Sequence, residues 1–462
     1  MKEKIRIQNM INKITIKVCI LAIVVAWIPY YVAYAPGNVP YDGMTQLLEY
    51  FGKLPHYDHH PVFVTHLYGR IVRIGIAISD YNMGILLVTV FQGVLCLLAF
   101  GRVCNYIYNR FSSRIPLTLT TCFYAFFPVW GSYCVSVMKD TFYMSITINF
   151  IVDMCYLIER IAEDNDMNNC KRSIIIVFEM LLMSISRHES KFCLIILGIF
   201  LFWRFFHFRK QFFTIFIIWM ILFFSYSVYI HSMVGIPKGE IGEALSIPFQ
   251  QTARYVRDLG DNLTDEEYQK INAVLPVEEL AEHYNPVLSD KIKARLRSGC
   301  SKKQYLDYAF IWFKMGLKNP KVYLAAYWDN YSGYLNPFYI AGESFFGAYI
   351  DRGQVAPEDE LPISHYSVDT GLRDIIDKYV KTLRLIPILS CIFAAGFYVW
   401  AIGCLWLIYI TKKKTWEKCM LIFPSLCIGI CFMSAANGYF RYIITICAAM
   451  PLYIALAAKK KN

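Results

Sequence analysis

Two acidic residues stand just beyond hydrophobic stretches, where a carboxylate could act at a membrane surface. Asp42 ends the polar segment 36–42 after the first stretch, and Asp140 follows Lys139 directly ahead of the fourth. A carboxylate can remove a proton from a hydroxyl group, and a lysine beside it can bind a phosphate. Each residue also has a structural interpretation, because Asp caps helices and Lys reaches from a helix end to the membrane interface. The residues alone leave both interpretations open.

The loop that follows Asp42 contains further ionisable groups. His56, Asp58, His59 and His60 lie within about twenty residues of Asp42 and precede a proline. So many such groups beside a membrane favour a polar site over a simple turn. We therefore count His59 and His60 among the candidate substrate-binding residues. Adjacent histidines rarely point at one ion, so we assign no metal ligands.

Two arginines are expected on the same side of the membrane as these acids. Arg187 lies between the fifth and sixth hydrophobic stretches, and Arg441 opens the last one. Positive charge on the outer side runs against the usual bias of membrane proteins. Each arginine therefore needs an acidic partner or an anionic ligand, and anchoring at the interface is the alternative for both.

The elements that must position these residues are membrane-spanning helices. Hydrophobic residues make up 56% of the chain and charged residues 18%, and apolar stretches repeatedly approach the length of a span. We predict an all-α polytopic membrane protein with about ten spans. The stretch 61–78 is instead predicted to be an amphipathic helix at the surface. The ten candidate spans are 18–34, 83–101, 116–135, 141–158, 172–186, 190–206, 211–231, 384–410, 418–434 and 441–458.

Lysine and arginine near the span ends predict the orientation. With ten spans, the basic segments all fall on one side, which the positive-inside bias makes cytoplasmic. Both termini are then cytoplasmic, and the acids face outward. The net charge of +11 follows from this topology and does not indicate nucleic acid binding. The basic segments are 2–17, 102–114, 171–172, 204–210, 412–418 and 459–461.

Three regions follow from the same pattern. Residues 1–231 are predicted to form a core of about seven spans with outer loops 35–82 and 136–140. Residues 232–382 form a polar, helical insertion outside the membrane, and residues 383–462 add about three spans. The chain has fifteen cysteines, but the insertion contains only Cys300. An internal disulfide is therefore excluded there, and no cysteine pattern has zinc-ligand spacing.

Local signals predict the helices of the insertion. Thr264 and Glu267 form a capping box that opens a helix over 265–275, ahead of a shorter helix over 277–283. Ser301 caps a helix from Lys302 to Leu317, and a proline at position 320 starts another that runs through 331. These last two helices are rich in aromatic residues. Such residues suit either a helix at the lipid interface or packing inside the insertion.

The order of these features resembles the GT-C superfamily of integral-membrane glycosyltransferases, and more narrowly a poorly characterised bacterial branch of it. A cytoplasmic basic end and a first span precede an acid in the first outer loop, and a late arginine lies in the terminal spans. The resemblance covers essentially the whole chain, and the order of the motifs gives it its specificity. The matching motifs are Pro36-Gly37, Asp42, Gln46, His59-His60-Pro61, Pro128 with Lys139-Asp140, Gln251-Thr252-Ala253-Arg254-Tyr255 and Asn319-Pro320.

The resemblance implies transfer of a sugar from a polyprenyl-phosphate-linked donor at the outer face of the plasma membrane. The acceptor would be a glycan, lipid or protein of the cell envelope. Asp42 would be the general base of an inverting reaction, with Asp140 assisting it. Better-known members often have two adjacent acids in the first outer loop, whereas Gly43 follows Asp42 here. The resemblance therefore names no certain cofactor and leaves dependence on a divalent cation open.

The resemblance also implies which residues bind substrate. Lys139, Arg187 and Arg441 would hold the donor phosphate. The remaining candidates are His59, His60 and Arg254.

A transporter or flippase of a lipid-linked or anionic solute is the alternative function, and a sensor or assembly protein is a third. The sequence shows no inverted repeat, and its candidate charges lie at the outer surface rather than at mid-membrane. Both observations favour the enzyme. Convergence of Asp42, Asp140 and Arg441 on one outer cavity would favour the enzyme. A transporter would need a path that reaches the cytoplasmic side, and a scaffold would show scattered charges and no cavity.

Overall fold

The structure of the chain is a computed structural model that describes residues 2–164, 167, 170–239, 241–342, 344–353, 355–367, 370–434 and 436–458. These described parts are helical and contain only isolated β-bridges, with no named strand. The all-α prediction is therefore confirmed for them. The basic segment 459–461 lies outside the described residues.

Helices occur at every predicted span, but few are long. Four segments have the length and apolarity to cross a bilayer: Ile14–Tyr34, Tyr81–Phe111, Lys139–Glu163 and Phe206–Met233. Residues Pro387–Phe393 and Ala395–Thr411, which meet at 93°, would form a fifth span if they act together. The chain is thus an α-helical membrane protein, and the count of ten spans stays a prediction.

The bundle contains α1 (Lys2–Tyr34), α4 (Tyr81–Phe111), α7 (Lys139–Asp164), α8 (Cys170–Ser186), α9 (Ser190–Arg204), α10 (Arg209–Val228), α19 (Ala395–Thr411), α20 (Glu417–Met420), α21 (Ile422–Cys431) and α22 (Ile444–Ala457). The predicted span 116–135 is broken into α5 (Arg114–Phe126) and α6 (Pro128–Cys134). Phe127 is extended at the break, as expected for a residue before proline. The stretch 61–78 forms α3 (Val62–Ile78), which packs mainly against α4.

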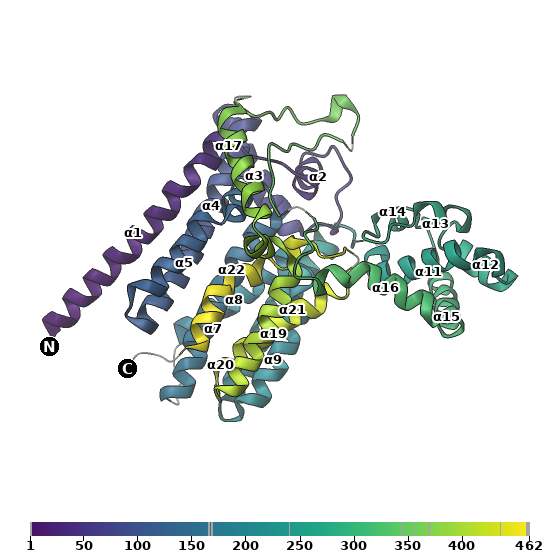
Figure 1. Cartoon of the computed structure of the whole chain (residues 1–462). Coiled ribbons are helices and arrows are strands. Elements are labelled where there is room, and N and C mark those ends of the chain that lie inside the picture. The colour runs from purple at the N-terminus through teal and green to yellow at the C-terminus, as the bar shows by residue number, and fades with distance from the viewer. Residues whose placement is uncertain are drawn as a thin grey trace.

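The insertion projects from one end of the bundle (Figure 1). It consists of α11 (Ser246–Leu259), α12 (Asp265–Asn272), α13 (Val277–His283), α14 (Asp290–Lys293), α15 (Lys302–Lys318) and α16 (Pro320–Leu335). Both predicted caps are confirmed, because Thr264 and Ser301 each form a complete capping box. Helix α12 ends three residues earlier than predicted, in a tightened turn where the backbone N–H of Val274 bonds the carbonyl of Ile271.

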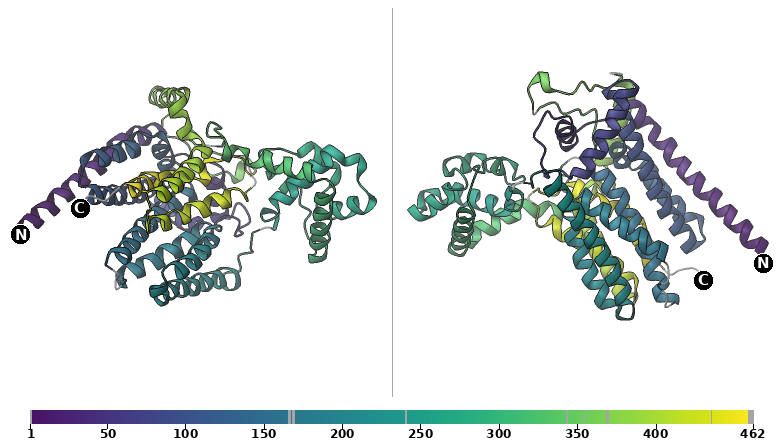
Figure 2. Two further views of the ribbon diagram at one scale, coloured as in Figure 1. Left: turned by 60° about the horizontal axis from the view of Figure 1, so that its bottom comes forward. Right: turned by 180° about the vertical axis from the view of Figure 1, so that it is seen from behind.

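Both chain termini lie at the end of the bundle opposite α2 (Tyr41–Tyr50), as Figures 1 and 2 show. We call these the terminus end and the loop end. At the terminus end, buried Arg110 donates to the Ala455 carbonyl at 3.2 Å and lies 3.5 Å from Glu417. Arg441 precedes the opposite end of α22, which spans about 21 Å at 1.5 Å per residue. Charged residues therefore gather at both ends of the bundle.

Backbone pairing at the loop end fixes α2 against the start of α7. The N–H of Asn38 donates to the Val135 carbonyl at 2.7 Å, and the N–H of Val137 donates back to the Asn38 carbonyl at 2.9 Å. Gln92 of α4 secures the same segment, because its side chain donates to the Ser136 carbonyl at 2.8 Å and accepts from the backbone N–H of Met138. Segments 38 and 135–138 are thus held side by side.

Gly43 allows α2 to approach this segment closely. A Cβ at position 43 would lie 2.1 Å from the carbonyl oxygen of Val137, which is closer than a real contact permits. The obstacle is backbone that Gln92 and Asn38 already hold in place. Asp42 therefore reaches its position because the next residue has no side chain.

We predict that Gly43→Ala lowers stability, because α2 must move away from the Val137 carbonyl. The expected loss is roughly 1–3 kcal/mol, the usual cost of overpacking a well-packed site. Thermal unfolding of the detergent-purified protein measures it. Gly403→Ala is the matched control, since position 403 lies in α19 with no neighbouring atom within 4 Å. Equal stability of the two variants would contradict this account of Gly43.

Candidate functional site

Asp42 lies between two cations that come from distant parts of the chain. Its Oδ2 atom is 3.0 Å from the Lys139 Nζ atom and 3.2 Å from the Arg441 Nη1 atom. Asp42 occupies the first turn of α2, whose N-cap is Pro40, and no side chain caps this helix. The alternative interpretation of Asp42 as a helix cap is therefore wrong.

The two cations control the charge of Asp42. Burial alone would raise the pKa of this carboxyl group, but Arg441 and Lys139 together outweigh burial and hold the pKa well below its ordinary value. The Asp42 side chain is 19% exposed, so a ligand can approach it. With both cations in contact, Asp42 is a stable carboxylate and a weak base.

His60 is a neutral member of the site. It is buried, and its Nδ1 atom lies 3.1 Å from the Lys139 Nζ atom. Burial, and then the charge of Lys139, lower the pKa of His60 to about 2. The ammonium group can only donate, so Nδ1 accepts and the imidazole proton resides on Nε2. His60 can therefore offer an N–H group to a ligand oxygen without adding charge.

A second ion pair lies beside the first. Arg187 is 3.4 Å from Asp140 and 3.4 Å from Glu189. The Tyr442 ring lies close to two guanidinium groups, 5.2 Å from that of Arg187 and 5.3 Å from that of Arg441. The Asp42–Arg441 and Asp140–Arg187 ion pairs therefore adjoin one another across the Tyr442 ring, and convergence on an outer cavity stays a prediction.

Some polar atoms of this group have no partner within the protein. The Asp140 Oδ2 atom and the Arg441 Nε atom are buried and make no hydrogen bond. Buried polar atoms without partners are costly and are concentrated at functional sites. These two atoms leave one acceptor and one donor for a bound molecule.

The insertion positions Arg441 through Asn437. The Asn437 Oδ1 atom accepts from the backbone N–H of Gly333 at 2.7 Å, and its Nδ2 atom donates to the Asp329 carbonyl at 2.6 Å. Gly438 follows with φ of +66°, a conformation that favours glycine. Helix α16 thus holds the segment that presents Arg441 to Asp42.

Glu49 is a site residue that sequence reasoning missed. It lies seven positions after Asp42, on the same face of α2. The side chain is buried, and its Oε2 atom has no hydrogen-bond partner. Burial raises the pKa of Glu49 to about 8 against the opposing effect of Lys139, so its carboxyl group is mainly protonated at neutral pH. The spacing within α2 was the signal that could have identified it.

Asp58 of the first outer loop forms a neighbouring cluster with two histidines. The Asp58 carboxylate is 3.5 Å from His188 and 3.4 Å from His231. His59 is largely exposed, with its Nδ1 atom 4.0 Å from Glu243. Asp58 therefore connects the loop to the start of α9 and the end of α10, while His59 points toward the insertion.

Arg254 does not join the site. It lies in α11 of the insertion, where it pairs with Asp258 at 3.0 Å and also with Asp329. Among the predicted substrate-binding residues, the structure brings together Lys139, His60, Arg187 and Arg441. His59 contacts this group only through the His60 ring, with 4.6 Å between the ring centroids, and Arg254 lies apart from it. Within the described residues, no group of three or more His, Cys, Asp or Glu side chains is placed to hold a metal ion.

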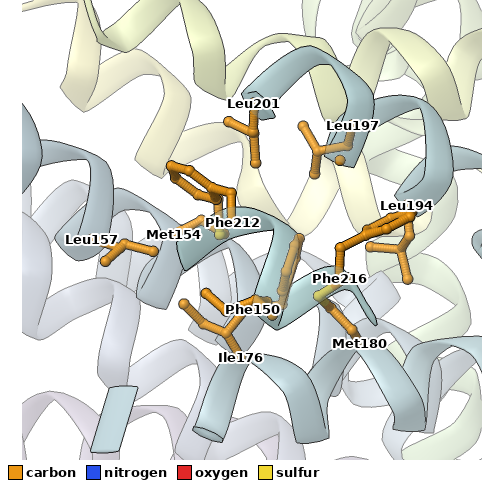
Figure 3. A pocket seen from close by; sticks show the side chains of 12 residues that line it. Phe150, Met154, Leu157, Ile176, Met180, Leu194, Leu197, Leu201, Phe212 and Phe216 are labelled. Atoms are coloured by element: carbon orange, nitrogen blue, oxygen red, sulfur yellow. The ribbon is translucent and has the colours of Figure 1, made fainter. Parts of the chain in front are cut away.

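An apolar pocket lies deeper in the bundle, between α7, α8, α9 and α10 (Figure 3). Phe150, Ile176, Leu197 and Phe212 are among its lining residues. Phe150 follows Lys139 by eleven positions in α7, or about 16 Å along the helix. The pocket is therefore separate from the charged residues at the loop end.

No curated protein and no solved structure matches this chain. The sequence pattern of one protein family matches residues 56–462, and that family is described as one of unknown function (DUF6020). The matched region includes Lys139, Arg187 and Arg441, whereas Asp42 precedes it. Because the match covers most of the sequence, the chain belongs to the DUF6020 family of unknown function.

Proposed function

We propose that this protein is a GT-C-like glycosyltransferase that transfers a sugar from a polyprenyl-phosphate-linked donor to an acceptor of the cell envelope. One observation carries the proposal: a carboxylate, Asp42, lies within 3.2 Å of two cations at the loop end of a membrane-spanning bundle. Such a site holds the two kinds of group that the reaction needs. These are a proton acceptor for the acceptor hydroxyl and positive charge for the donor phosphate.

The reaction is a single displacement at the anomeric carbon. The acceptor oxygen forms a bond to that carbon, the bond to the phosphate oxygen breaks, and the electron pair leaves with the phosphate. The hydroxyl proton moves to Asp42. Phosphate is a good leaving group, so the step requires no general acid, and attack from the opposite face inverts the anomeric centre.

Lys139 and Arg441 would link donor binding to activation of the base. In the structure both cations neutralise Asp42 and keep the pKa of its carboxyl group low. A donor phosphate would compete for the same cations, which are the usual partners of phosphate oxygens. As the cations turn toward the phosphate, the pKa of Asp42 rises and the carboxylate becomes a stronger base.

Neighbouring residues have supporting roles in this proposal. Arg187 would add positive charge to the phosphate site, and Asp140 would hold Arg187 or orient the acceptor through its unpartnered Oδ2 atom. His60 would donate its Nε2 proton to a sugar or phosphate oxygen. Glu49, whose pKa is raised to about 8, would supply a neutral carboxyl group beside Asp42.

The proposed topology puts the loop end outside the plasma membrane and both termini in the cytoplasm. Several cations lie together at the terminus end, where Lys412 and Lys414 donate to carbonyl groups at the end of α22. Arg110 lies at the same end. Clustering of lysine and arginine at one end supports this orientation.

We predict that Asp42→Asn abolishes sugar transfer, because an amide cannot accept the hydroxyl proton. The assay measures transfer from a panel of radiolabelled polyprenyl-phosphate hexoses in membranes that contain the protein. Asp359→Asn is the control for loss of a carboxylate in an exposed ion pair and should retain activity. Full activity of the Asp42 variant would eliminate it as the base. Movement of intact donor across the membrane without transfer would favour the transporter.

We predict that Lys139→Ala and Arg441→Ala each reduce donor use by roughly ten- to a hundredfold, the equivalent of about 1.5–3 kcal/mol for a charge-assisted contact. The two losses should be less than additive, because both cations contact one phosphate. The Lys139 variant should also shift the acid limb of kcat/KM to higher pH, since it removes one of the cations that lower the pKa of Asp42.

Lys53→Ala is the control for these two variants, because Lys53 forms an exposed pair at the same end. Additive losses, or an acid limb that stays at the same pH in the Lys139 variant, would contradict the shared phosphate site.

We predict that an impermeant thiol reagent labels Asp261→Cys in intact cells, because the insertion lies outside. Lys413→Cys, in the basic loop after α19, should be labelled only after the cells are opened. Both variants are made in a chain with Cys300 replaced by serine, which removes the partly exposed thiol of the insertion. Labelling of position 413 and protection of position 261 in intact cells would invert the proposed orientation.

A further inference from the structure

Helix α15 carries apolar side chains on two opposite faces. One face packs into the core of the insertion through Tyr308, Ile311 and Met315, which are almost fully buried. The other face presents Leu306, Phe310, Phe313 and Leu317, each at least 59% exposed. Their spacing of i, i+4, i+7 and i+11 places them on one stripe along the helix. The core of the insertion accounts for the first face and leaves the second uncovered.

Helix α16 extends this uncovered surface. Leu324 is 67% exposed and Trp328 is 59% exposed, and the two lie one turn apart on one face. Of the aromatic residues noted in the sequence, Trp312 and Tyr323 pack inside the insertion, whereas Phe313 and Trp328 do not. Packing inside the insertion is therefore confirmed for Trp312 and Tyr323, and contact with the lipid interface stays a prediction for Phe313 and Trp328.

The surface continues onto the membrane-spanning bundle. The exposed indole of Trp400 in α19 donates to the carbonyl of Leu335 at the end of α16. Further along α19, Leu407 is 66% exposed, as expected for a side chain that faces lipid. In Figure 1, α15 and α16 form the lower side of the insertion, and the bundle beside them also continues downward. The right view in Figure 2 shows the same arrangement.

Positive charge flanks the apolar stripe. Lys302 and Lys303 are exposed in the first turn of α15, and Lys321 is exposed in the first turn of α16. Cations are unfavourable near a helix N-terminus, where the macrodipole is positive. Their position therefore does not stabilise these helices, but it suits contact with anionic lipid headgroups.

We infer that the insertion rests on the bilayer through a lipid-facing stripe made of Leu306, Phe310, Phe313, Leu317, Leu324 and Trp328. The stripe lies in the interfacial layer, and Lys302, Lys303 and Lys321 contact anionic headgroups. The inference is independent of the proposed enzymatic activity. It requires only that the bundle spans the membrane, and it assigns a lipid surface as the partner of α15 and α16.

Spin-label accessibility in the full-length protein tests this assignment. Nitroxides are attached at Phe313→Cys and, as matched control, at Glu282→Cys, an exposed position on α13 of the same insertion. The background chain has cysteines 122, 300, 404 and 427, which are accessible among the described side chains, and also Cys170 replaced by serine or alanine. The protein is reconstituted in nanodiscs of phosphatidylcholine and phosphatidylglycerol. Collisions with oxygen, which enters lipid, are compared with collisions with a water-soluble nickel chelate.

The label at position 313 should collide with oxygen several-fold more, relative to the chelate, than the label at position 282. Equal ratios would overturn the inference. Strong dipolar coupling between labels at position 313 on two copies would also overturn it, because a second copy would then cover the stripe. In discs without phosphatidylglycerol, a label at Leu306→Cys should become more accessible to the chelate. An unchanged value there would refute the role of the lysines.

Discussion

The loop end of this protein depends on one electrostatic constraint: charges that are largely removed from water must compensate one another. Asp42, Lys139 and Arg441 belong to α2, the start of α7 and the segment ahead of α22, and their ion pairs are 3.0 and 3.2 Å long. A buried charge without a partner costs several kcal/mol, so loss of Asp42 would penalise both cations, and loss of either cation would leave Asp42 less compensated. These ion pairs therefore join three distant parts of the chain as well as defining a chemical site.

The surrounding structure makes this compensation geometrically feasible. Gln92 and Asn38 fix the backbone ahead of Lys139, and Gly43 lets α2 approach it. Asn437 fixes the segment ahead of Arg441. The ion pairs therefore form between elements that are already positioned by hydrogen bonds. When a ligand binds one of the two cations in place of Asp42, these hydrogen bonds keep the surrounding backbone in position.

The features that were predicted correctly from the sequence are those that depend on residues close together in the chain. The capping boxes at Thr264 and Ser301 and the helix start at Pro320 depend on residues within one turn, and the structure has all three. The break at Pro128 had an equally local signal, which the apolar composition of 116–135 obscured. Sequence also selected Asp42, Lys139, Arg187 and Arg441 as candidates, because charge beside an apolar stretch is unusual.

Contacts between distant positions could not be predicted in this way. Asp42 and Arg441 are 399 positions apart, and a single sequence contains no signal that they pair. Arg254 was grouped with the site through its motif, yet its partner Asp329 lies within the insertion. Glu49 was overlooked because its raised pKa results from burial, which the sequence of α2 does not reveal.

Helix α16 connects the inferred lipid-facing stripe to the segment ahead of Arg441. Leu324 and Trp328 emerge on one side, while the backbone of Asp329 and Gly333 holds Asn437 on another. These groups are at most nine positions apart on a single rigid helix, about 14 Å at 1.5 Å per residue. A tilt of α16 would therefore strain the bonds that locate Arg441. A change in how deeply the inferred stripe lies in the bilayer would therefore shift the guanidinium group of Arg441 through this helix.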